Sequence, residues 1–404
     1  MTSKRSARGL DWLTFFAADV QTGFGPFVAV YLAMHAWSDA QVGLALSIGS
    51  LTMLLSQVPA GAAVDMLPHK RMAAMAALIA IAGSAILLAL WPDPVPVYAA
   101  ELLHGFASCV LVPALAAISL ALVGRKALSD RLGRNGRFSA LGNAMAAGLL
   151  GVTGAYISIA AVFWLTAALT VPALLALFAI RSEDMAGRVQ AMRKQRSGER
   201  GLRRLLLNRG VFVFAACVAL FTLANAAMLP LASTAITRAS GPVSNLTVAG
   251  GIVVSQLVVA GLSPWIARLA DRRGRRAALL LGLLALPLRG MLLALINSPT
   301  ALLAAQALDG ISAAMLAVLV PLIAADLTRG TNRFNLCMGV FGLAVGIGAT
   351  VSTLAAGAIA SWFGTPLAMG CLAAVGLACF LLALAAMPET REKKAAREKD
   401  LALA

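Results

Sequence analysis

The sequence predicts an all-α membrane protein, and three observations support this fold class. Of the 404 residues, 60% are hydrophobic and 12% are charged, whereas soluble domains are about 45–50% apolar and about 25% charged. The apolar residues form runs long enough for membrane helices, which need about 20 residues to cross about 30 Å of hydrocarbon. Turn residues and basic residues alternate between these runs, as in helices that cross a membrane back and forth. The composition therefore argues against a soluble globular enzyme.

Twelve apolar runs of sufficient length can be placed along the chain. The predicted spans are 10–34, 41–64, 72–91, 97–123, 138–156, 160–180, 211–235, 246–267, 277–296, 300–327, 336–360 and 367–387. They form an N-terminal six-helix half over 1–180 and a C-terminal six-helix half with a short tail over 210–404, joined by a basic linker over 181–209. The predicted fold is therefore twelve transmembrane helices in two pseudo-symmetric six-helix bundles.

The basic residues predict the orientation of these spans. Of the 33 Lys and Arg, all except Arg238 and Arg289 lie in the tails, the linker or one alternate set of loops. Basic residues accumulate on the cytoplasmic side of membrane proteins, so both termini and the linker are expected in the cytoplasm, beside anionic lipid headgroups. A net charge of +16 could also indicate a nucleic-acid binder. The mean hydropathy of +0.86 argues against that partner.

The two halves resemble each other in sequence. Residues 99–106 (AAELLHGF) in the fourth span match residues 304–311 (AAQALDGI) in the tenth. Residues 136–139 (GRFS), before the fifth span, match residues 332–335 (NRFN), before the eleventh. A parallel duplication of this kind places a binding site near the midplane between the halves, where rocking exposes it to either side in turn.

Two loops at equivalent positions carry a recognisable signature. Residues 267–276, between the eighth and ninth spans, have the sequence ARLADRRGRR, and residues 61–71, between the second and third, have GAAVDMLPHKR. This pattern of aspartate, glycine and basic residues resembles the loop signature of the major facilitator superfamily, and the resemblance extends over essentially the whole chain. It implies a monomeric secondary transporter that moves a small-molecule substrate by alternating access, here in the bacterial inner (plasma) membrane.

The signature loops are candidate gating elements. A helix dipole favours an aspartate at the start of a helix, and adjacent arginines can pair with it, so such a cluster can hold one conformation shut. Alternatively, the basic residues only fix topology and bind lipid headgroups. The loop at 267–276 keeps more of the signature, so Asp271 is expected to matter more than Asp65. The candidate gating residues are Gly61, Asp65, Lys70, Arg71, Asp271, Arg272, Gly274, Arg275 and Arg276.

Ionisable side chains within the predicted spans form a second group of candidates, because each costs about 2.5–3.5 kcal/mol at the bilayer centre. Asp19 lies near the middle of the first span, and Glu101 and His104 share one face of the fourth. Arg289 in the ninth span and Asp309 in the tenth lie at similar depths. We therefore predict an intramembrane ion pair between Arg289 and Asp309.

The resemblance adds expected roles for these residues. In the superfamily, the first, fourth, seventh and tenth spans line the central cavity, whereas the ninth is a supporting helix. The implied substrate or proton ligands are Asp19, Glu101, His104, Asn225, Gln306 and Asp309. The chain resembles the drug:proton antiporter branch but departs from it, because Glu101 stands where that branch carries an arginine and the glycines of the fifth span lack its proline.

Three functions remain open from the sequence. The first is proton-coupled export of a small apolar or cationic organic compound. The second is import or facilitated passage of a polar metabolite or metal chelate, and the third is a receptor or lipid-handling protein that does not transport. Motifs for enzyme catalysis are missing, since the chain has no nucleophile elbow, phosphate loop or HExxH. Its five cysteines form no CxxC, so no catalytic residue, cofactor or metal site is expected.

We expect Asp19→Asn to abolish solute accumulation driven by a pH gradient, because an asparagine can neither exchange a proton nor neutralise a substrate cation. Binding of a neutral solute should survive the substitution. Transport into proteoliposomes with an imposed pH gradient measures both. An unchanged pH dependence would show that Asp19 is structural and would move the coupling site to Glu101 or Asp309.

Overall fold

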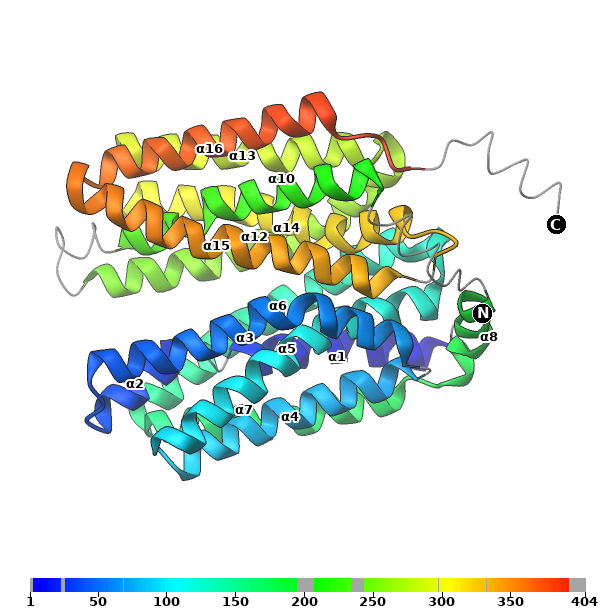
Figure 1. The fold of residues 1–404 in the computed structure, drawn as a ribbon, viewed down its shortest axis with the longest axis horizontal. Coiled ribbons are helices and arrows are strands. Elements are labelled where there is room, and N and C mark those ends of the chain that lie inside the picture. Colours follow the sequence, from blue (N-terminus) through cyan, green and yellow to red (C-terminus); the bar gives the residue numbers. More distant parts are fainter. Residues whose placement is uncertain are drawn as a thin grey trace.

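The computed structural model describes residues 3–22, 26–67, 69–194, 207–233, 243–296, 298–331 and 333–391. Within these ranges the chain is helical apart from short turns and contains no strand. The helices form two bundles that lie side by side, with their long axes roughly parallel to the long axis of the molecule (Figure 1).

The N-terminal bundle contains the helices up to Ala179, and a further helix follows it. Its elements are α1 (Lys4–Thr22), α2 (Pro26–Met34), α3 (Asp39–Met66), α4 (Lys70–Leu90), α5 (Pro94–Val123), η1 (Arg125–Ala127), α6 (Leu128–Tyr156), α7 (Ile159–Ala179) and α8 (Glu183–Lys194). The helix α8 lies across one end of this bundle, near the N-terminus (Figure 1).

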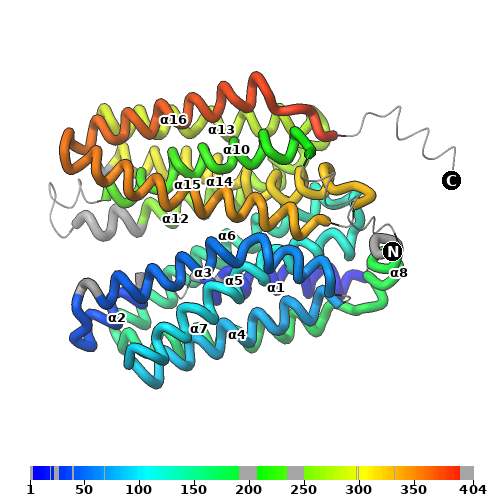
Figure 2. The backbone as a smooth tube through the Cα atoms, in the orientation of Figure 1, coloured from blue at the N-terminus to red at the C-terminus, as the bar shows by residue number. Residues whose placement is uncertain are grey.

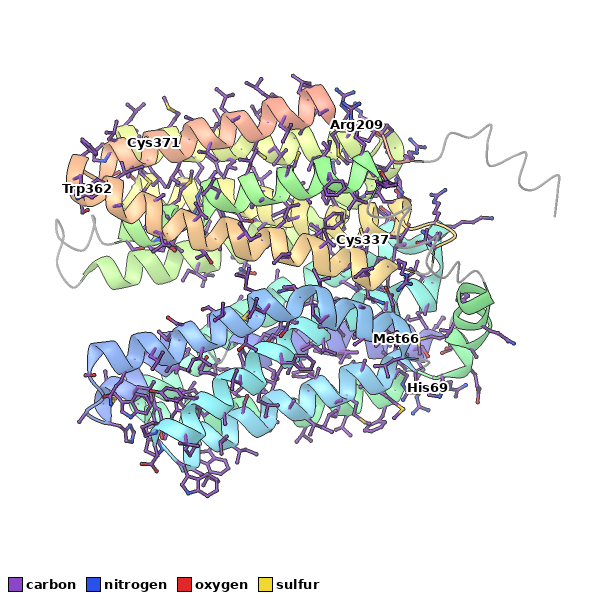
Figure 3. All side chains as sticks on the ribbon, viewed as in Figure 1. Met66, His69, Arg209, Cys337, Trp362 and Cys371 are labelled. Carbon is purple, nitrogen blue, oxygen red and sulfur yellow. The ribbon has the colours of Figure 1, made fainter. Side chains whose placement is uncertain are left out.

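The C-terminal bundle has the same general arrangement. Its helices are α10 (Arg209–Asn225), α12 (Val243–Arg273), α13 (Arg275–Leu295), α14 (Pro299–Leu327), α15 (Phe334–Phe363) and α16 (Thr365–Ala386). We call the end of the molecule that carries α8 and the start of α1 the basic end, because Lys4, Lys70 and Arg275 begin helices there. Arg209 lies toward this end and Trp362 at the opposite, far end (Figure 3).

Eleven helices in the described ranges are long and apolar enough to cross a membrane. They correspond to the second to twelfth predicted spans. The first predicted span, 10–34, consists of α1 and α2, with residues 23–25 between them outside the described ranges. Pro26 is the first residue of α2, a position that suits a residue without a backbone N–H. The described chain therefore supplies eleven of the twelve expected continuous spans.

The fifth span is longer than predicted and corrects one boundary. Its helix α6 starts at Leu128, ten residues before the predicted start of the span, so most of the predicted basic loop is helical. Leu128 and Leu132 are buried there, and Arg131 is neutralised by an aspartate of α1. Charged residues mark the end of a membrane helix only when they face water, and this arginine does not.

Serine residues start several helices at the far end. The side chain of Ser38 accepts a hydrogen bond from the backbone of Gln41 in a complete capping box at the start of α3. The side chains of Ser158 and Ser298 likewise accept a backbone hydrogen bond at the starts of α7 and α14. These caps satisfy backbone donors that would otherwise lack a partner, which explains why short serine- and proline-containing loops suffice to reverse the chain.

The two bundles approach each other at the basic end. The tube drawing shows them diverging toward the far end (Figure 2). Each bundle has its own apolar core, and the core of the C-terminal half continues into α6 and the end of α5. The two bundles thus contact each other through α6 and α12 and through α3 and α15, close to the predicted gating loops.

Candidate functional site

A buried arginine organises the polar cluster of the C-terminal half. Arg289 of α13 is only 2% exposed. Its Nη1 donates to Asp309 Oδ1 at 2.7 Å and also to Asn225 Oδ1, and its Nη2 donates to Gln306 Oε1 at 3.4 Å. One guanidinium group therefore ties α10 and α14 to α13.

Asp309 and Asn225 are the members of this cluster that are partly exposed, whereas Arg289 and Gln306 are buried. The Asp309 side chain is 20% exposed, and its second carboxylate oxygen accepts a hydrogen bond from Ser255 Oγ of α12 at 3.1 Å. Two buried donors of the cluster, Arg289 Nε and Gln306 Nε2, have no acceptor among the described residues. An unmade buried hydrogen bond costs about 1–3 kcal/mol, so the cluster retains the capacity to bind an acceptor group.

The N-terminal half carries a buried carboxylate at the equivalent place. Glu101 of α5 is 6% exposed, and no ion pair in the described ranges includes it. It lies against Gly49 of α3, where a Cβ would collide with its carboxylate. Gln306 lies against Gly251 of α12 in the same manner. The sequence duplication is thus matched by a structural one, in which a polar side chain faces a glycine of the neighbouring helix.

The structure places the other expected ligand residues at different sites. His104 lies one turn from Glu101, with its Nε2 at 3.4 Å from Ser108 Oγ. Asn225, Gln306 and Asp309 come together around Arg289. The backbone of Asp19 belongs to α1, but its side chain lies outside the described residues.

Asp65 of the first signature loop contacts the opposite half. Its Oδ1 accepts hydrogen bonds from the backbone N of Asn335 at 3.0 Å and from Asn335 Nδ2 at 2.7 Å, and its Oδ2 accepts one from the backbone N of Leu336 at 2.9 Å. These donors lie in the first turn of α15, so an N-terminal-half carboxylate caps a C-terminal-half helix. Gly61 allows the approach, because a Cβ there would collide with the Asn335 backbone.

The basic residues after Asp65 serve the N-terminal half itself. Lys70 Nζ donates to the backbone oxygens of Asp65 at 3.2 Å and Leu67 at 3.0 Å, and also to that of Val64. Arg71 Nη1 donates to Ser182 Oγ at 2.6 Å. The lysine therefore closes the end of α3, and the arginine attaches the start of α8.

The second signature loop makes its contacts within the C-terminal half. Asp271 is 39% exposed and accepts a hydrogen bond from Arg275 Nη1 at 2.9 Å. Arg275 Nε donates to Asp326 Oδ2 at 3.0 Å. Gly274 adopts a positive φ of 101°, and Glu389 of the tail accepts from the next backbone N–H at 2.9 Å. The described contacts thus give Asp65, and not Asp271, the bond between the halves.

Further hydrogen bonds join the halves at the same end. Ser129 Oγ of α6 donates to the backbone oxygen of Ala267 at 2.8 Å, and Arg125 Nη1 donates to that of Ala325. A Cβ at Gly133 would collide with α12, and one at Gly339 would collide with the backbone of α3. The basic end is therefore closed by helices in near backbone contact.

An ion cluster that the sequence did not predict joins α1 to α6. Asp11 is buried, and its Oδ1 and Oδ2 lie at 2.5 Å from Arg131 Nη2 and Arg134 Nη2, respectively. Both arginines fell in a predicted loop, so a buried partner was not sought. An aspartate just inside a span, together with two arginines one helical turn apart, is the signal that could have revealed it.

Neutralising either Arg289 or Asp309 alone should destabilise the C-terminal half. We expect Arg289→Met or Asp309→Asn to lower the free energy of unfolding by about 3–5 kcal/mol, because each leaves a buried polar group without its partner. The double variant should lose less than the sum of the two. Equilibrium unfolding of purified protein tests this, with the exposed Lys126→Met as control. Strict additivity of the two effects would contradict an energetic link between them.

Comparisons with known proteins agree with this architecture. The family model described as Major Facilitator Superfamily matches residues 10–286 and 238–402. MFS-type transporters from two strains of Mycobacterium tuberculosis are 35% identical over 392 residues, which cover 96% of this chain and 94% of theirs. The crystal structure of the human organic anion transporter MFSD10 (TETRAN) superposes with a TM-score of 0.70 at 18% identity, over 94% of this chain and 99% of that one. The chain therefore belongs to the Major Facilitator Superfamily, as an integral membrane transporter and not an enzyme.

Proposed function

We propose that the protein is a proton-coupled exporter of a small apolar or cationic organic compound in the bacterial inner membrane, with its basic end in the cytoplasm. The observation that carries this proposal is Glu101, a buried carboxylate without a cation partner among the described residues. A carboxylate at membrane depth must be neutralised by a proton or by a cation. Exchange of one for the other at a single site couples proton entry to solute exit.

The contacts that close the basic end are those expected of one state of an alternating-access transporter. With the basic end in the cytoplasm, the bonds of Asp65 to α15 close the cytoplasmic side, and the state is outward-facing. Rocking of the two halves to the inward-facing state breaks these bonds. Asp65 then sets the balance between the two states, because its hydrogen bonds stabilise only one of them.

The polar cluster of the C-terminal half favours a second candidate function. Arg289 Nε and Gln306 Nε2 are donors without described acceptors, and a solute with carbonyl or carboxylate oxygens would satisfy them. Import or facilitated passage of a polar metabolite would use this cluster. MFSD10, by its description an organic anion transporter, provides a precedent for acceptor-rich solutes on this fold. The two candidates differ in the half of the molecule that binds the solute.

Replacing Glu101 with glutamine tests whether this carboxylate couples proton entry to solute transport. The C-terminal half already carries a glutamine at the equivalent position, Gln306, so the fold should accept the change. We expect Glu101→Gln to abolish uptake of a cationic dye into proteoliposomes driven by a pH gradient, while exchange of a neutral apolar solute without a gradient persists. Glu183→Gln, which removes an exposed carboxylate of α8, is the control. Normal gradient-driven uptake by Glu101→Gln would refute the coupling role.

Loss of the Asp65 carboxylate should open the basic end. Hydrogen bonds to a charged group contribute about 1.5–3 kcal/mol, so we expect Asp65→Asn to speed maleimide labelling of the native Cys337 about tenfold or more. Cys337 is buried in the first turn of α15, toward the basic end (Figure 3). Site-specific labelling can be read by mass spectrometry, and Cys379, buried in α16, reports global loosening.

The matched variant is Asp271→Asn, which should change Cys337 labelling less because its described ion pair stays within one half. Equal acceleration by both variants, or parallel acceleration at Cys379, would show that Asp65 does not act as a specific bond between the halves.

A further inference from the structure

A cavity of about 580 Å³ lies at the basic end, and Lys70 and Arg71 of the first signature loop line part of it. It is bounded by α4, α7 and α8, and His69, at its rim, lies beside α8 (Figure 3). Its volume falls within the range of about 300–1,000 Å³ that is typical of small-molecule sites.

One wall of the cavity is apolar and continues onto the outer surface of the bundle. Met72 of α4 and Phe178 of α7 line it and are 55% and 58% exposed. Met185 and Val189 of α8 face them across the cavity. Because the outer surfaces of α4 and α7 meet hydrocarbon in a membrane protein, the cavity is open to lipid chains at the depth where the spans end.

The rim of the cavity is basic and rich in hydrogen-bond donors. None of the described residues that line it is a carboxylate, and α4 starts there without a side-chain cap or an acidic residue in its first turn. Arg71 uses Nη1 to bind Ser182, whereas its buried Nε has no acceptor among the described residues. A helix N-terminus beside an arginine with unused donors favours a phosphate group.

The position of α8, which forms the outer wall, is fixed by hydrogen bonds at its start. Besides the bond from Arg71, Ser3 Oγ donates to Asp184 Oδ2 at 2.6 Å. Hydrogen bonds from Ser3 and Ser6 hold the pKa of the Asp184 carboxyl below its usual value. This carboxylate is therefore occupied by the N-terminal segment and does not line the cavity.

We propose that this cavity binds one anionic phospholipid, with its phosphate at Arg71 and the start of α4 and an acyl chain between Met72, Phe178 and Met185. A free phosphate would leave the apolar wall exposed, and a neutral hydrophobe would leave the donors of Arg71 without acceptors. An anionic amphiphile satisfies both parts of the cavity. Its binding joins α8, in the linker between the halves, to the N-terminal bundle, and this goes beyond general attraction of basic residues to headgroups.

The test uses the delipidated full-length protein in neutral detergent and native mass spectrometry. The probes are phosphatidylglycerol, phosphatidylcholine and inorganic phosphate. We expect the wild type to retain one phosphatidylglycerol in preference to phosphatidylcholine. Arg71→Gln should weaken this binding about tenfold, as expected for loss of a charge-assisted phosphate contact.

Two further variants test whether lipid binding depends on the cavity or only on surface charge. Ala186→Trp fills the cavity from the exposed face of α8 without changing charge, and it should also weaken phosphatidylglycerol binding about tenfold. Lys126→Gln removes an exposed charge at the same end but outside the cavity, and should change binding by less than about twofold.

Three outcomes would overturn the proposal. Equal weakening by Lys126→Gln and Arg71→Gln would indicate surface charge alone. Equal retention of the two lipids would indicate an apolar groove without a phosphate site. Displacement of phosphatidylglycerol by inorganic phosphate, together with normal binding by Ala186→Trp, would indicate a simple anion site.

Discussion

The free-energy cost of an isolated charge in hydrocarbon governs how both halves of this transporter are built. Arg289 is almost fully buried and is stabilised by Asp309, Asn225 and Gln306. In the N-terminal half the buried charge is that of Asp11, which two arginines of α6 neutralise. Each cluster ties separate helices of one half together, so separating those helices would leave a charge without its partner. These clusters therefore favour keeping the helices of each half together.

The bonds between the halves are of a different kind. The carboxylate of Asp65 meets backbone N–H groups at a helix start, and no arginine or lysine is left buried when the two separate. Water at the basic end can replace these hydrogen bonds, at a net cost far below that of breaking a buried ion pair. Carboxylates paired with arginines thus hold the helices of one half together, whereas a carboxylate bonded to backbone N–H groups makes a contact between the halves that can break. Glu101 is buried and has neither kind of partner among the described residues.

Much of this arrangement could be predicted from the sequence, and the failures have physical causes. Length and hydropathy predicted twelve spans, of which the described chain supplies eleven as continuous helices. Equal depth predicted that Arg289 and Asp309 meet, and their side chains lie 2.7 Å apart. The partners of Asp11 were not predicted, because Arg131 and Arg134 were assigned to a loop on account of their charge. The larger effect expected for Asp271 than for Asp65 was inferred from how complete each signature is, and it stays a prediction. The signature of a loop does not show which helix of the other half lies next to it. Asp65 bonds to the other half because the start of α15 lies next to it.

The hydrogen bonds between the tail and the residues on either side of Gly274 have a practical consequence for producing the protein. Glu389 lies beyond the last membrane helix, yet it accepts hydrogen bonds from the backbone of Arg275 and Arg276, and Arg391 donates to the backbone oxygen of Arg272. The segment up to Arg391 is therefore part of the folded C-terminal half. An affinity tag or fluorescent fusion joined directly after Pro388 would remove these acceptors and loosen the turn before α13, whereas attachment after Arg391 leaves the turn intact.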